Sequence, residues 1–247
     1  MEPLPADIAP DIETASPAYA QRFAGSVGQF FLTRQAEAVL SMLEHKPLTI
    51  LEVGGGHLQL TQHLLNAGHK ICIHGSSELA LGSARELAET HTSRLDTVVS
   101  PLTALPFADK SFDVVIAMRL LCHMDSWEKM IDELCRVSRH CVIMDYPPSS
   151  SFNFLYPLLF GLKARLEKNT RTYLRFDPKE IAACLRKSKF SDIRQEREFF
   201  FPMVIHRVLK WRRLSELMEA FASWLGLTNK LGSPVVICAT YVMDTKI

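Results

Sequence analysis

The stretch "ILEVGGGHLQL", residues 50–60, brings an apolar run to an acid, Glu52, and then to three consecutive glycines. The run predicts a buried strand over residues 48–53. Three glycines in succession indicate that something passes so close to the backbone that side chains are excluded. A glycine turn straight after a strand is typical of the first strand of a doubly wound sheet, where ligands bind at the carboxyl ends of the strands.

Two classes of ligand use such a turn. A dinucleotide site requires a glycine at the position that Gln59 occupies here, so the dinucleotide fingerprint fails and a dehydrogenase is a distant alternative. The other class places an acid two residues before the first glycine, where it faces a cationic ligand. Glu52 stands at that position, and it suits the ammonium and sulfonium groups of S-adenosylmethionine.

Strand patterns alternate with helical patterns on both sides of this stretch. Such alternation predicts βαβ units with right-handed crossovers, hence an α/β doubly wound, mostly parallel sheet with helices on both faces. The predicted strands are 48–53, 70–75, 95–100, 112–118 and 140–146, and the predicted helices are 19–45, 58–68, 77–91 and 127–138.

The pattern changes after Tyr146. Basic helical segments are predicted at 157–168 and 177–188, then an extended run at 192–202, a long helix to Leu225 and a closing strand. We expect a flexible segment over 1–18 and a single domain over 19–247. Within that domain the expected parts are a helical lid at 19–45, a cofactor-binding core at 48–146, a helical substrate cap at 150–225 and the closing strand at 234–244.

Composition is that of an ordinary globular protein, with 47% hydrophobic and 22% charged residues in 247. No apolar run reaches the length of a membrane span, and the acidic, proline-rich N-terminus does not resemble a signal peptide. The six cysteines are scattered, which favours reduced thiols in a cytoplasmic protein over a disulfide framework or a metal site.

Charge is divided unevenly along the chain. Residues 1–150 hold 11 Lys and Arg against 18 Asp and Glu, and residues 151–247 hold 17 against 9. A solvated basic face is the preferred interpretation. The alternative is a surface for an anionic substrate or a membrane. No nucleic-acid motif is present, so no nucleic acid partner is expected.

Residues 48–146 resemble a class I S-adenosylmethionine-dependent methyltransferase of the type 11, small-molecule kind. The resemblance rests on the acid and glycines from Glu52 to Gly56, on "LPFADKSFDVVIAMRLLCHM" at 105–124, and on "WEKMIDELCRVSRHCVIMDYP" at 127–147. The stretch "SPVVICATYVM" at 233–243 resembles the family's closing strand. This resemblance implies a seven-stranded, Rossmann-like sheet with an antiparallel last strand and a helical C-terminal insertion. It also implies S-adenosylmethionine as cofactor and a small-molecule methyl acceptor.

Three positions depart from the family pattern. Leu58 replaces the third glycine, Pro101 replaces an acid that often holds the adenine amine, and no acid follows the second strand to bind the ribose hydroxyls. Each lost charge-assisted bond weakens binding by about 1–3 kcal/mol. A non-catalytic methyltransferase-like protein that binds a partner or ligand through its basic, helical end is therefore the alternative function.

The expected cofactor-binding residues lie at the strand ends and in the N-terminal lid. They are Glu52, Gly54, Gly55, Gly56, His57, Gly75, Ser76, Ser77, Leu102, Met118, Tyr19 and Arg22. Two of them have an alternative role, since His57 could cap a helix and Arg22 could pair with an acid such as Asp11 or Glu37.

Methyl transfer is an in-line displacement in which the enzyme mainly aligns donor and acceptor. The sequence therefore carries no specific catalytic signature. The weak candidates are His123 and Tyr146, and Arg119 and Asp145 also lie near strand ends. Their alternative roles are structural: packing for His123, and strand termination for Asp145 and Tyr146.

The late basic segment has apolar residues at helical spacing: Val204, Val208, Trp211, Leu214 and Leu217. We expect this face to pack on the domain. Contact with a membrane surface or with a hydrophobic, anionic acceptor is the alternative. The sequence does not decide between a monomer and a homodimer.

Overall fold

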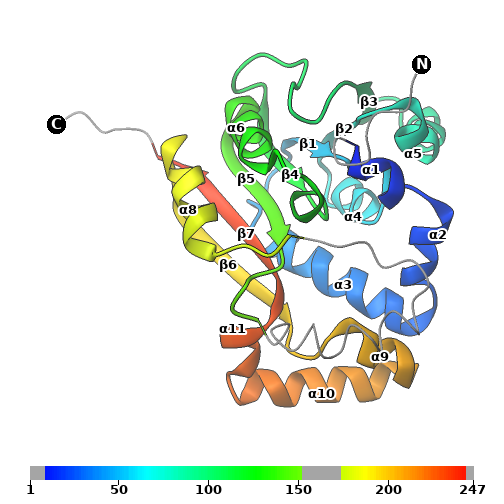
Figure 1. Cartoon of the computed structure of the whole chain (residues 1–247). Helices are drawn as coiled ribbons and strands as arrows, with labels where there is room; N and C mark the ends of the chain where they lie inside the picture. The colour runs from blue at the N-terminus through cyan, green and yellow to red at the C-terminus, as the bar shows by residue number, and fades with distance from the viewer. Residues whose placement is uncertain (1–8, 152–173, 243–247) are drawn as a thin grey trace.

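A seven-stranded sheet forms the centre of the computed structural model, which describes residues 9–151 and 174–242. The strand order is β3-β2-β1-β4-β5-β7-β6 (Figure 1). The strands are β1 (Thr49–Val53), β2 (Lys70–Gly75), β3 (Leu95–Val99), β4 (Phe112–Ala117), β5 (Ser138–Tyr146), β6 (Phe190–Phe199) and β7 (Ser233–Tyr241). Strands β1 to β5 pair in parallel, and β7 runs antiparallel to both β5 and β6. The predicted fold class is confirmed.

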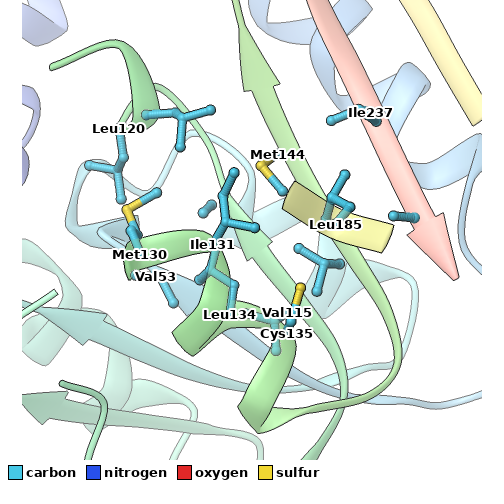
Figure 2. Packing of buried hydrophobic residues seen from close by; sticks show 14 of the residues in the cluster. Val53, Val115, Leu120, Met130, Ile131, Leu134, Cys135, Met144, Leu185 and Ile237 are labelled. Carbon is cyan, nitrogen blue, oxygen red and sulfur yellow. The ribbon is translucent and has the colours of Figure 1, made fainter. Parts of the chain in front are cut away.

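Helices cover both faces of the sheet because the strands are apolar on both sides. One face packs against α3 (Gly25–Ser41), α4 (Thr61–Asn66) and α5 (Glu78–Thr90). The other packs against α6 (Trp127–Val137) and α8 (Pro178–Lys187). Figure 2 shows this second core, which brings Ile131 and Leu134 of α6 into one cluster with Met144 of β5.

The order of the strands reverses beside β1. Ile50 of β1 pairs with Ile71 of β2 on one side and with Val114 of β4 on the other. In a doubly wound sheet this reversal opens a crevice at the carboxyl ends of the strands. The glycine turn therefore begins at the position where this fold binds its ligands.

Short helices at the N-terminus lie over this carboxyl edge. They are α1 (Pro10–Thr14), α2 (Pro17–Ala20) and the 3-10 turn η1 (Gln21–Phe23). Helix α1 contacts both α5 and the glycine turn. The prediction of a flexible segment over 1–18 is wrong for residues 10–18, because Asp11 is fully buried and bonded to the end of β2.

The C-terminal helices differ from the single long helix that we predicted. The chain forms α9 (Met203–Leu209), α10 (Arg212–Trp224) and α11 (Leu227–Leu231). Lys210 takes the left-handed conformation at φ 53° and ends α9. The predicted helix at 157–168 lies outside the described residues. No helix in the described part of the chain has the length and apolarity to cross a membrane.

Candidate functional site

The glycine turn is held tightly against its neighbours. Gly54 takes the left-handed conformation at φ 67°, and its N–H donates to the carbonyl of His74 at 2.7 Å. The next three residues form the 3-10 turn η2 (Gly55–His57). A Cβ on Gly56 would lie 1.7 Å from the carbonyl oxygen of Ala80, so the turn packs directly on the first turn of α5. Leu58, at the family's third glycine, has φ 56°, which glycine adopts without strain.

Glu52 lies beneath this turn at the end of β1. Its side chain is buried, and Oε2 accepts a hydrogen bond from the Thr61 hydroxyl at 2.7 Å. The other oxygen, Oε1, has no hydrogen-bond partner among the described residues. Burial raises the pKa of Glu52 to about 7, and the Thr61 bond opposes this shift. The site thus holds a buried carboxylate with one unused oxygen, which a cation or a donor group would satisfy.

His57 ends η2 and is half-buried. Its Nδ1 accepts a hydrogen bond from the backbone N–H of Gln59 at 3.2 Å, so the ring caps the turn. Burial and the nearby Arg119 lower the pKa of His57 to about 3, so the ring is neutral. A neutral ring attracts a carboxylate weakly. This geometry favours the capping role over contact with the carboxylate of a cofactor.

An acid from α1, which the sequence analysis missed, lies against the end of β2. Asp11 of α1 accepts hydrogen bonds from the Ser76 N–H at 2.7 Å and from the Ser76 hydroxyl at 2.6 Å. Ser77 instead caps α5 by accepting from the Ala80 N–H at 3.3 Å. The family places an acid directly after β2, and here a carboxylate reaches that place from a helix 65 residues earlier in the chain.

The two residues expected from the lid contact each other. The Arg22 guanidinium lies 5.1 Å from the centre of the Tyr19 ring, and it forms an ion pair with Glu13 at 3.8 Å. Arg22 therefore pairs with an acid, as its alternative role proposed, but with Glu13 rather than Asp11 or Glu37. Tyr19 is buried against Phe23 and α3.

The ends of β4 and β5 are joined by Arg119 and Asp145. Arg119 takes a left-handed conformation at φ 62°, which lets its backbone N–H donate to the Asp145 carboxylate. Its guanidinium lies 4.0 Å from the centre of the Phe23 ring and donates to the Gln35 side chain of α3 at 3.2 Å. Burial raises the pKa of Asp145, while the Arg119 bond opposes the shift.

A further buried acid, Glu198 near the end of β6, belongs to the same group. Burial raises the pKa of Glu198 to about 8, Arg119 lowers it and Asp145 raises it. Its Oε1 has no hydrogen-bond partner within residues 9–151 and 174–242. We call Gln35, Arg119, Asp145 and Glu198 the edge cluster. No pattern in the sequence pointed to Glu198, because the residues of its strand are mostly charged and predict an exposed strand.

The two weak catalytic candidates lie at the end of β5 and in the turn that follows β4. Tyr146 packs with Phe176 on the opposite face of the sheet, at 6.2 Å between ring centres, and burial raises its pKa to about 12. His123 closes the 3-10 turn η3 (Leu121–His123) after β4. Leu102 and Met118 are fully buried in the two cores, and a Cβ on Gly75 would meet Leu81 at 2.7 Å.

These buried groups make the stability of the fold fall as pH rises from about 6.5 to 8. Glu52 and Glu198 keep their protons in the folded state up to about pH 7 and 8 but lose them near 4.5 when unfolded. Burial lowers the pKa of His57 and His74 to about 3 and 4, which offsets this effect only below pH 6.5. We expect the free energy of unfolding to fall by about 2 kcal/mol between pH 6.5 and 8.

Urea denaturation at the two pH values measures this loss. Glu198→Gln should remove most of it, whereas Glu196→Gln, two residues earlier on the same strand, should not. A wild-type stability that rises between pH 6.5 and 8 would contradict the assignment of buried protonated acids.

Comparison with known proteins agrees with this geometry. Residues 51–141 match the family model of a methyltransferase domain. No curated protein matches the chain. Magnesium protoporphyrin IX methyltransferase from Synechocystis PCC 6803, solved with bound S-adenosylmethionine, is 14% identical over 94% of this chain and 97% of its own, with a TM-score of 0.62.

Two other solved structures have the same fold. A 1,6-didemethyltoxoflavin-N1-methyltransferase from Burkholderia thailandensis is 18% identical over 86% of this chain and 79% of its own, with a TM-score of 0.54. The [4+2]-cyclase SpnF is 15% identical over 85% and 81%, with a TM-score of 0.57. At these identities the likeness shows the fold alone.

The fold and the glycine turn define a class I, Rossmann-like methyltransferase architecture. Residues 51–141 match the model of a methyltransferase domain, so the predicted resemblance is confirmed. The family match supports the prediction of a S-adenosylmethionine-dependent enzyme.

Proposed function

We propose that this protein is a S-adenosylmethionine-dependent methyltransferase that acts on a small-molecule acceptor. The observation that carries the proposal is Glu52, a buried carboxylate with an unused oxygen beneath a glycine turn at the switch point of the sheet. A cationic ligand at that place would satisfy the orphaned oxygen and favour its ionised form. S-adenosylmethionine has such a cation and supplies the methyl group when bound.

The chain's own residues would hold the cofactor and keep out water. Glu52 would face the charged methionine end, and the glycine turn would leave room for it. The N-terminal helices α1 and α2 and the turn η1, which lie over the carboxyl edge of the strands, would cover the site. The expected lid helix α3 and the described elements α8 and β6 of the expected cap belong to the core of the domain instead. Close positioning and exclusion of water account for most of the rate in such a displacement.

Asp11 would supply the acid that the sequence lacks after β2. Its carboxylate already receives two hydrogen bonds from Ser76, and it retains lone pairs for ribose hydroxyls. Asp11→Asn keeps the size of the side chain but removes the charge. We expect it to weaken binding of S-adenosylhomocysteine about tenfold, measured by calorimetric titration.

The matched control for Asp11 is Glu13→Gln, which lies on the same helix and pairs with Arg22. It should leave the affinity for the nucleoside unchanged, and the melting temperature of both variants separates binding from folding. Tighter binding by Asp11→Asn would contradict this role and would show that α1 blocks the nucleoside site.

The acceptor is proposed to carry an N–H or O–H group at the reacting atom. The edge cluster holds two buried carboxyl groups, Asp145 and Glu198, whose pKa values burial raises, so each could exchange a proton with such a group. Glu198, whose pKa burial raises to about 8, would take a proton from such a group once it is ionised, so turnover should rise as the pH approaches 8.

Release of S-adenosylhomocysteine from panels of small amines, phenols and carboxylic acids tests this proposal. Turnover with amines or phenols, and its loss in Glu198→Gln, is the expected result. Turnover confined to carboxylic acids would contradict the proposed acceptor class. No turnover with any panel, despite measured cofactor binding, would favour the non-catalytic alternative.

A further inference from the structure

Helix α10 lies along one edge of the molecule with its apolar side facing outward. It occupies the bottom of the view in Figure 1, one layer beyond α3, which it contacts. Its buried positions are Ser215, Glu219 and Ala222. Its outward stripe consists of Leu217, Phe221 and Trp224, whose side chains are 68%, 60% and 79% exposed. This arrangement is the reverse of a core-facing amphipathic helix.

Buried polar bonds fix the rotation of α10. The Glu219 carboxylate accepts from the backbone N–H groups of Phe200 and Phe201 at 2.8 and 3.0 Å. It is also bonded to Nε2 of the buried His206 of α9 at 2.9 Å. Turning the apolar stripe inward would break these bonds and expose the groups they satisfy. The fold therefore holds the apolar stripe of α10 toward the outside.

Further exposed apolar side chains lie just before α10 and at its end. Val208 and Trp211 are 59% and 61% exposed, and Leu225 follows Trp224 at the other end of α10. We call Val208, Trp211, Leu217, Phe221, Trp224 and Leu225 the outward apolar face. Our expectation that Val208, Trp211 and Leu217 pack on the domain is wrong, because Glu219 and His206 hold the opposite side of the helices inward.

Cationic side chains accompany the outward apolar face. Lys210, Arg212 and Arg213 are all exposed beside Trp211, and Arg212 donates a hydrogen bond to Glu216 at 2.6 Å. Tryptophan beside lysine and arginine is the composition that binds at a bilayer surface, where indole rings lie among headgroups and cations attract anionic lipid.

We propose that the outward apolar face binds the surface of an anionic lipid bilayer, with α10 lying in the plane of the headgroups. In this orientation the apolar side chains would be buried among the lipids, and the basic residues would face the lipid phosphates. The proposal thus accounts for both the exposed apolar side chains and the cations beside them. A second copy of this chain fits less well, because a two-fold contact between these faces would bring their arginines together. The proposal does not depend on the cofactor or on the acceptor.

Co-sedimentation of the full chain with lipid vesicles tests the proposal. The probes are vesicles of phosphatidylcholine alone and of phosphatidylcholine with about 30 mol % phosphatidylglycerol. We expect binding to the anionic vesicles, little binding to the neutral ones, and weaker binding as salt is raised. The double variant Trp211→Ser, Trp224→Ser should bind about tenfold more weakly.

The matched control is Leu79→Ser, which removes an equally exposed apolar side chain, 80% exposed, from α5. It should bind like the wild type. All three positions are exposed, so circular dichroism should show an unchanged fold. No sedimentation with anionic vesicles would overturn the proposal, as would dimers in analytical ultracentrifugation that disappear in the tryptophan double variant while vesicle binding is unchanged.

Discussion

Replacing Glu52 with glutamine is expected to weaken the binding of S-adenosylmethionine about 30-fold. Glutamine has the same shape and retains an oxygen that accepts from Thr61, so the turn above it should stay in place. What is lost is the charge that would pair with the cationic end of the cofactor. Calorimetric titration of the variant and the wild type measures the difference.

The pH dependence of binding adds a second readout for the same residue. Because burial holds the pKa of Glu52 at about 7, the wild type must release a proton to pair with a cation below that pH. Affinity should therefore rise by up to about tenfold between pH 6 and 8 in the wild type, and it should be flat in Glu52→Gln. Glu78→Gln, an exposed acid at the start of α5, is the control. Equal affinity in Glu52→Gln and the wild type would remove Glu52 from the site.

Substitution of Gly56 by alanine is expected to cost about 3 kcal/mol of stability. The new Cβ would lie 1.7 Å from the carbonyl oxygen of Ala80, and backbone cannot move aside as a flexible side chain can. The glycine turn and the start of α5 would have to separate. Urea denaturation measures the loss, and cofactor binding should fall with it because the turn would be displaced.

Gly82→Ala is the matched control for this substitution. Gly82 lies within α5, and a Cβ there would meet nothing within 4 Å. Alanine is the better helix former, so this variant should gain about 0.5–1 kcal/mol. A Gly56→Ala variant as stable as the wild type would show that the turn is looser than described.

Most of the sheet could be predicted because its signals are local. Apolar runs ending at Glu52, Gly75 and Tyr146 correspond to β1, β2 and β5, since buried parallel strands are apolar on both faces. The end of helix α9 at Lys210, which divides the expected long helix in two, was not predicted. Apolar spacing continues through it, and nothing local marks a left-handed lysine.

The candidate site was predicted only where it follows the motif. Glu52 and the glycines are consecutive residues, so a pattern finds them. Asp11 is bonded to Ser76 across 65 residues, and Arg119 affects the pKa of Glu198, which lies on a strand late in the chain. Those contacts depend on tertiary packing, which residue spacing does not encode. The absence of an acid directly after β2 was the one sequence feature that could have indicated a carboxylate supplied from elsewhere in the chain, as Asp11 is.

Calorimetric titration of the wild-type protein with S-adenosylmethionine and with S-adenosylhomocysteine tests the central claim most directly. We predict binding of both in about the micromolar range, which is common for cofactors at substrate-level concentrations. No heat and no thermal stabilisation at millimolar concentrations of either would contradict a cofactor site at the glycine turn. The fold would then serve a binding function, as in the non-catalytic alternative.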